Sequence, residues 1–130
     1  MFRVFSKSLC EKADGIIYIY DITEYKSFEC IPNYIKKVST DVKKNVYEVL
    51  AANKCDKEED RVVTEEKGKK LAQEFNMNFF ETSCLKRQNV NEVFNYLISE
   101  ILKNIKKNEN NDNKIVLNND NKHENKNGCW

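Results

Sequence analysis

The order of apolar and polar residues predicts three strand-then-helix units between residue 1 and about residue 107. Apolar runs of strand length, rich in β-branched and aromatic side chains, cover residues 15–21, 47–53 and 78–82. Apolar residues at helical spacing follow each run, over residues 24–39, 64–75 and 90–107. Such runs are typical of strands buried on both faces of a parallel sheet, with helices packed on those faces. The pattern therefore predicts an α/β fold.

Local signals place the helix boundaries. In the first helix, Thr23 is a candidate N-cap, and Pro32 should end a short first turn, with a restart near Ile31. Thr64 is expected to open the second helix, and Asn76 to follow its end in the left-handed conformation.

The last helix is predicted to start at a capping box, Asn89 to Glu92. Its apolar residues are expected to form one buried stripe: Val90, Phe94, Leu97, Ile98, Ile101 and Ile105.

Residues 108–130 lack this periodicity. Asparagine mixed with Lys, Asp and Glu dominates the segment, and one short apolar stretch, residues 115–117, interrupts it. Such a segment buries too little apolar surface to offset the entropy of ordering it. The sequence therefore predicts a folded body over residues 1–107 and a disordered, Asn-rich tail over residues 108–130.

Composition narrows the classes of function. Of the 130 residues, 40% are hydrophobic and 33% are charged, which fits one domain with a modest core. The net charge of +1 gives no electrostatic reason to bind nucleic acid. The five cysteines are scattered and odd in number, which favours reduced thiols over a disulfide or zinc framework. No metal site is predicted, and no apolar run is long enough to span a bilayer.

Polar residues follow each predicted strand, at residues 21–23, 53–56 and 82–84. In a parallel sheet, ligands bind just beyond the carboxyl ends of the strands. These three segments are therefore the candidate binding site.

Two of the segments have the chemistry to recognise guanine, which presents two adjacent donors beside the O6 acceptor. The acceptor-only carboxylate of Asp56 can take both donors and reject adenine. Asn53 could contact the base or tie neighbouring loops together, and the stem of Lys54 could lie over the ring while its ammonium stays solvated. The backbone N–H of Cys84 could reach O6, with Ser83 Oγ orienting Asp56. Taken alone, Asn-Lys-x-Asp is also a common turn sequence, and only its position after a buried strand favours binding.

At this point the chain resembles a known family. Residues 53–56 (NKCD) and 81–83 (ETS) are similar to the two base-recognition motifs of Ras-superfamily GTPases, and residues 13–17, 20–23 and 27–28 are similar to the Rab branch. The resemblance runs from residue 1 to about residue 107. It implies the C-terminal half of a P-loop-NTPase-like three-layer α/β domain, binding of GTP or GDP, and a switch in vesicle trafficking that meets effectors and exchange factors.

Several positions depart from the family pattern. The chain has no Gly-rich phosphate loop ending in Gly-Lys-Ser/Thr, no switch threonine and no Asp-x-x-Gly-Gln segment. By the resemblance those segments lie upstream, so Mg²⁺ is expected only in a complete member and this chain alone is expected to be inactive as a GTPase. Leu85, which is included in the predicted site, stands where a lysine usually stacks on the base. Leu9 and Cys10 replace the usual tyrosine pair, and the single Cys129 leaves membrane attachment by prenylation open.

Three interpretations follow. The first is the C-terminal half of an ordinary Rab-like GTPase, in the cytoplasm and peripheral on endomembranes. The second is a short, non-hydrolysing interaction module, a truncated pseudo-GTPase. The third is an unrelated α/β binding domain, such as a receiver-like fold. The sequence favours the first, because a chain without the phosphate half would expose an uncharged strand, residues 16–20, at the sheet edge.

Overall fold

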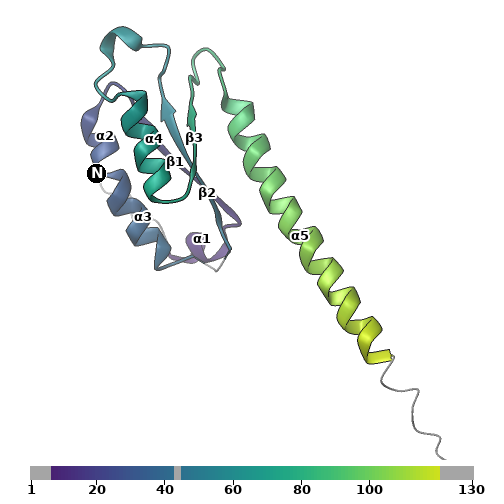
Figure 1. Cartoon of the computed structure of the whole chain (residues 1–130). Coiled ribbons are helices and arrows are strands. Elements are labelled where there is room, and N and C mark those ends of the chain that lie inside the picture. The colour runs from purple at the N-terminus through teal and green to yellow at the C-terminus, as the bar shows by residue number, and fades with distance from the viewer. Residues whose placement is uncertain (1–6, 43–44, 121–130) are drawn as a thin grey trace, which may run out of the picture.

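The computed structural model describes residues 7–42 and 45–120. Within them, three strands alternate with helices: α1 (Lys7–Lys12), β1 (Gly15–Asp21), α2 (Tyr25–Glu29), α3 (Ile31–Ser39), β2 (Tyr47–Asn53), the 3₁₀ turn η1 (Glu58–Asp60), α4 (Glu65–Glu74), β3 (Asn78–Glu81) and α5 (Val90–Asp120). The strands form one parallel sheet in the order β1-β2-β3 (Figure 1). The predicted α/β class and all three strands are confirmed.

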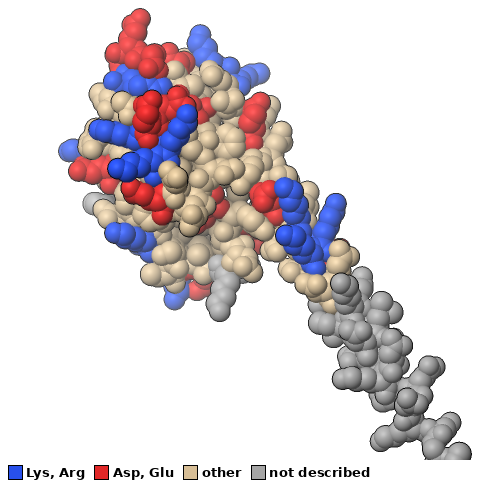
Figure 2. Space-filling view, in the orientation of Figure 1, with Lys and Arg blue, Asp and Glu red and all other residues tan. Residues whose placement is uncertain are grey.

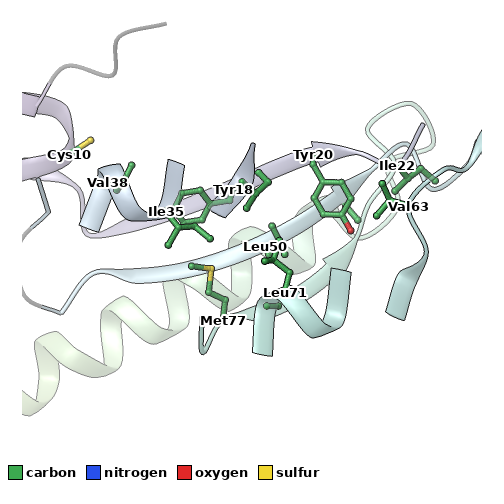
Figure 3. Close-up of a cluster of buried hydrophobic side chains, with 13 residues drawn as sticks. Cys10, Tyr18, Tyr20, Ile22, Ile35, Val38, Leu50, Val63, Leu71 and Met77 are labelled. Atoms are coloured by element: carbon green, nitrogen blue, oxygen red, sulfur yellow. The ribbon is translucent and has the colours of Figure 1, made fainter. Parts of the chain in front are cut away.

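Helices cover both faces of the sheet. The larger core lies between the sheet and α2, α3 and α4, and it contains Tyr18, Tyr20, Ile35, Val38, Leu50 and Leu71 (Figure 3). The smaller core lies under α5, where Val93 and Leu97 pack against Val49 of β2. Because successive strand residues point to opposite faces, Val49 and Leu50 reach different cores. This explains why β2 is apolar without alternation.

The boundaries of the first two helical segments depend on three local features. The predicted break at Pro32 is confirmed, because α2 ends at Glu29 and α3 starts at Ile31 with the proline in its first turn. Thr64 caps α4 by accepting the N–H of Lys67, and Asn76 is left-handed with φ 55°. Both of these features were also predicted.

Two predicted caps are wrong, because each side chain has another partner. Thr23 does not cap α2; its hydroxyl donates to the Asp21 carboxylate at 2.7 Å, and Glu24 occupies the N-cap. Asn89 has φ 57° instead of the extended backbone of an N-cap. Its Nδ2 donates to the carbonyl of Glu81 at 2.8 Å, which ties the start of α5 to the end of β3.

Helix α5 differs from the prediction in its length. It continues past Lys107 to Asp120, so residues 108–120 are helical although their sequence lacks helical periodicity (Figure 1). Extending a formed helix adds one backbone hydrogen bond per residue and needs no buried surface, so a helix can continue where the apolar periodicity ends. The remainder of the predicted tail, residues 121–130 with Cys129, lies outside the described residues.

Helix α5 also differs from the prediction in which of its apolar residues are buried. About half of the surface of four apolar side chains is exposed: Phe94, Ile98, Leu102 and Ile105. These residues form one flank of the helix, whereas Tyr96 on the opposite flank packs against Phe80 of β3. The exposed flank therefore faces beyond β1, where the sheet of the described residues ends.

Candidate functional site

The register of the sheet gathers the three candidate segments at one edge. Asp21 of β1 is level with Asn53 of β2, and Ala52 of β2 is level with Glu81 of β3. Since the strands are parallel, the loops that follow them emerge side by side. The structure thus brings together the strand ends that the sequence singled out as a binding site.

Asp56 and Ser83 meet across two of these loops. Ser83 Oγ donates to Asp56 Oδ1 at 2.6 Å. Ser83 Oγ also accepts a hydrogen bond from the N–H of Lys86 at 3.1 Å. Ser83 is fully buried, and its backbone exchanges two hydrogen bonds with Gln88, at 3.1 and 2.9 Å. The hydroxyl is therefore fixed from both sides and directs its proton to the carboxylate.

The contact with Ser83 favours the ionised form of the Asp56 carboxylate and leaves it free to accept further hydrogen bonds. The hydrogen bond from Ser83 holds the pKa of Asp56 below its usual value. Asp56 is therefore ionised at neutral pH. An ionised carboxylate has about four acceptor positions, and Ser83 uses only one of them. Asp56 can still accept two donors from a ligand.

Asn53 connects the loops. Its Oδ1 accepts the hydroxyl of Thr82 and the N–H of Cys84, both at 3.3 Å. The N–H of Cys55 donates to the Thr82 carbonyl at 3.0 Å, so the two loops are also joined through the backbone. Two roles were predicted for Asn53, contact with a base or a link between neighbouring loops. In the structure it links the loops. The Cys84 N–H, which the sequence offered to O6 of a base, contacts Asn53 here.

Lys54 forms an ion pair that the sequence did not predict, although its side chain stays 45% exposed. Its Nζ lies 2.5 Å from Asp21 Oδ2, across the ends of β1 and β2. Its backbone is left-handed with φ 66°, which is unusual for a residue with a side chain. The lysine is thus held at both ends of its side chain.

Leu85 lies at the tip of the loop between Ser83 and Gln88. Its side chain is 76% exposed, and beside it Cys84 is exposed as well. An exposed leucine can lie against a flat ligand but supplies no polar contact. Its place in the site remains a prediction.

An ion-pair network that was not predicted from the sequence holds the loop after Asp56. Arg61 donates to both carboxylate oxygens of Glu81, at 2.7 and 3.1 Å, and to the Val63 carbonyl at 3.1 Å. It also pairs with Glu58 in η1. The hydrogen bonds from Arg61 to the two glutamates raise its pKa further above the usual value. The sequence around Arg61 is rich in charged residues, so nothing in it distinguishes Arg61 from an arginine that is simply solvated.

The other described residues narrow what the site can do. No group of three or more His, Cys, Asp and Glu side chains within residues 7–42 and 45–111 is arranged to hold a metal ion. Among the helices described, none is long and apolar enough to cross a membrane. On the face seen in Figure 2, acidic and basic side chains are interspersed over the described part of the globular body.

Known proteins are similar to this chain over most of its length. The profile of the Ras family matches residues 1–103. The chain is 43% identical over 101 residues to Ras-related protein Rab-13 of Mesocricetus auratus, covering 78% of this chain and 50% of that protein. It is 38% identical over 102 residues to GTP-binding protein ypt2 of Schizosaccharomyces pombe, covering 78% and 51%. Ras-related protein Rab-8B of Dictyostelium discoideum is also 38% identical over 102 residues, covering 78% and 50%.

Proposed function

The chain belongs to the Ras family and is similar to its Rab members, and from that premise we propose that it is the base-recognising half of a guanine-nucleotide switch. It spans about half the length of the curated relatives that it matches. The proposed activity of the whole protein is to bind GTP and GDP with Mg²⁺ and to act as a switch in vesicle trafficking. In that role it would bind effectors and exchange factors. The proposed location is the cytoplasm and the surface of endomembranes.

One observation carries the proposal: the ionised Asp56 carboxylate is fixed by a buried serine. A fixed acceptor pair discriminates between bases better than a mobile one, because a wrong base then leaves an acceptor unsatisfied. Guanine offers N1–H and the 2-amino group to this pair, and adenine has no matching pair of donors. Asn53 holds the loop of Asp56 against the loop of Ser83, so the recognition geometry exists before a ligand arrives.

The open edge of the sheet supports a domain larger than this chain. β1 is an edge strand, and its Ile19 is 59% exposed. A cavity of about 510 Å³ lies beside β1 on its α3 side, lined by apolar residues that include Ile16, Tyr18 and Ile31. On the opposite face of the sheet, the four apolar side chains of the α5 flank are about half exposed. An uncharged edge with apolar surroundings is an aggregation hazard in a free domain.

We therefore propose that the other half of the domain, which the relatives possess, covers β1 and the exposed flank of α5. The alternative is the truncated interaction module, in which a partner protein or a second copy covers the same surface. That alternative requires a stable dimer or complex of the chain as purified. Analytical ultracentrifugation would distinguish a monomer from a dimer.

The affinity of this chain alone should be low. Each net hydrogen bond to the base contributes on the order of 1 kcal/mol, and about 2 kcal/mol where the acceptor is charged. Holding the ligand costs several kcal/mol. The binding free energy is therefore at best about −4 kcal/mol, so the affinity should be no tighter than millimolar. Hydrolysis of GTP by this chain is not expected, because its sequence has no phosphate loop.

The test is a titration of the 130-residue chain with GDP and with ADP, followed by amide NMR, together with a phosphate-release assay with GTP. GDP should bind at millimolar concentration and ADP more weakly. Asp56→Ala should weaken GDP binding by about tenfold and abolish the preference for GDP. Asp60→Ala, in η1 of the same loop, is the matched control and should change neither quantity. Equal effects of GDP and ADP, sub-micromolar binding, or turnover that Asp56→Ala abolishes would contradict the proposal.

A further inference from the structure

Asp21 occupies a prepared position at the end of β1. Its Oδ1 accepts the N–H of Thr23 at 2.8 Å and the Thr23 hydroxyl at 2.7 Å. Its own N–H donates to Ser27 Oγ at 2.9 Å. The side chain is only 18% exposed. Asp21 is therefore held by its own loop, with its second carboxylate oxygen directed at Lys54.

Lys54 is the residue that connects Asp21 to the candidate site. It follows Asn53, whose backbone is level with Asp21, and it precedes Asp56 by two positions. The left-handed backbone of Lys54 sets the direction in which its side chain leaves the loop. The ion pair of 2.5 Å with Asp21 Oδ2 fixes the other end. Its methylene stem therefore runs along the edge of the sheet between two fixed points.

The charges around this pair favour its ionised form. Burial alone would raise the pKa of Asp21, but the bonds from Lys54 and Thr23 outweigh it, and the pKa lies below its usual value. The hydrogen bond to Asp21 raises the pKa of Lys54, and Glu24 and Asp56 act in the same direction. The pair is thus ionised across the physiological pH range.

We propose that Asp21 is a positioning residue for base recognition: it anchors the ammonium of Lys54 so that the lysine stem lies ready against the face of a base held by Asp56. The inference rests on the proposed function. Asp21 touches neither the base nor Asp56 in this arrangement, and it acts only through Lys54.

A simpler interpretation is that the pair is an ordinary surface ion pair. Lys54 is 45% exposed, and exposed pairs contribute little to the free energy of unfolding. The two interpretations differ in their consequences. A surface pair affects neither stability nor binding, whereas an anchor that restrains a long side chain before binding raises affinity by about three- to tenfold.

The variant Asp21→Asn tests the anchor. It keeps an oxygen for Thr23 but removes the charge that faces Lys54. Glu65→Gln is the matched control, because it removes the carboxylate from the exposed Lys69–Glu65 pair, 2.6 Å long, on α4. Two readouts are taken on the whole chain. The first is the side-chain NMR signal of Lys54 against pH without nucleotide, and the second is the affinity for GDP and for inosine diphosphate, whose base lacks the 2-amino group.

In Asp21→Asn, the pKa of Lys54 should fall towards its ordinary value of 10.5. The affinities for both nucleotides should drop by the same factor, about three- to tenfold. The ratio of the two affinities should not change, because Asp56 still reads the 2-amino group. The thermal unfolding midpoint should stay within about 2 °C of that of the unsubstituted chain. Glu65→Gln should leave Lys54 and both affinities unchanged.

Three results would overturn the inference: an unchanged Lys54 signal, a released Lys54 with unchanged affinities, or a changed ratio of the two affinities. A chain that does not distinguish GDP from ADP overturns the proposed function, and the role of Asp21 in base recognition with it. In that case the Lys54 signal still decides whether Asp21 holds the lysine.

Discussion

Gly68 offers a sharp test of how closely α4 packs on the sheet. A Cβ at this position would lie 2.5 Å from Phe79 Cε2 and 2.7 Å from Phe79 Cζ, and closer still to the hydroxyl of Tyr20. Tyr20 is 2% exposed, so its ring is packed in the core. The glycine therefore allows a contact between helix and sheet that no other residue permits.

Two effects of opposite sign determine the result of Gly68→Ala. Alanine in a helix interior is favoured over glycine by about 1 kcal/mol. A methyl group forced into a packed core costs about 1–3 kcal/mol, and two aromatic rings at these distances place the cost at the upper end. The net expectation is a loss of about 1–2 kcal/mol in the free energy of unfolding.

A second substitution separates the two contacts. The hydroxyl of Tyr20 is buried without a hydrogen-bond partner among the described residues, so Tyr20→Phe should stabilise the fold by about 1 kcal/mol. In that background Gly68→Ala should cost less, because only the clash with Phe79 remains. The two sites therefore have a coupling energy that a double-mutant cycle measures.

The assay is urea unfolding followed by circular dichroism for the four chains of the cycle. Lys70→Ala, at an exposed position of α4, is the control and should change the free energy by less than about 0.5 kcal/mol. If Gly68→Ala instead stabilises the chain by the full helix-propensity term, α4 does not lie this close to Tyr20 and Phe79. Simple additivity of the two substitutions would also refute the contact with the hydroxyl.

Two further predictions concern pH and chain length. Burial raises the pKa of both Tyr18 and Tyr20 above the ordinary 10.0, so the folded state holds these protons more tightly than the unfolded state. The contribution of these two side chains to stability should be constant below about pH 9 and fall above pH 10.0, and Tyr18→Phe should weaken that fall in thermal scans. We also propose that the folded unit ends near residue 107: residues 108–111 are exposed, so deleting residues 108–130 should shift the melting temperature by less than about 2 °C, and a drop above about 5 °C would mean that the segment docks on the body.

The strands with continuous apolar sequence could be predicted. β1 and β2 lie within the apolar runs that predicted them, and the break before Pro32 follows from the missing N–H of proline. The meeting of Asp56 with Ser83 could also be predicted, because parallel strands bring their carboxyl ends to one edge. These features depend either on the chemistry of one short segment or on the parallel direction of the strands in the sheet.

Features that depend on side-chain competition could not be predicted in this way. The hydroxyl of Thr23 had two possible partners, the first turn of α2 and the carboxylate of Asp21, and only the fold decides between them. The ammonium of Lys54 had water as an alternative to Asp21. The length of α5 depends on helix extension, which leaves no mark in the pattern of burial. The ion pair between Lys54 and Asp21 could have been inferred only from the strand register, which places Asp21 beside Asn53.

In the described residues, the contacts around the candidate site join the ends of three strands, and from this we propose how the whole protein divides its work. Ser83, Asn53 and Asp21 contact the predicted recognition groups through bonds among the ends of β1, β2 and β3. None of these bonds involves the open edge of β1, where the sheet of the described residues ends. Discrimination between bases should therefore survive in this half alone, although the affinity is low. The other half would then add affinity through phosphates and metal without altering which base is preferred. A ratio of GDP to ADP affinity that is similar in this chain and in a full-length relative would support that division, and a ratio near one here would contradict it.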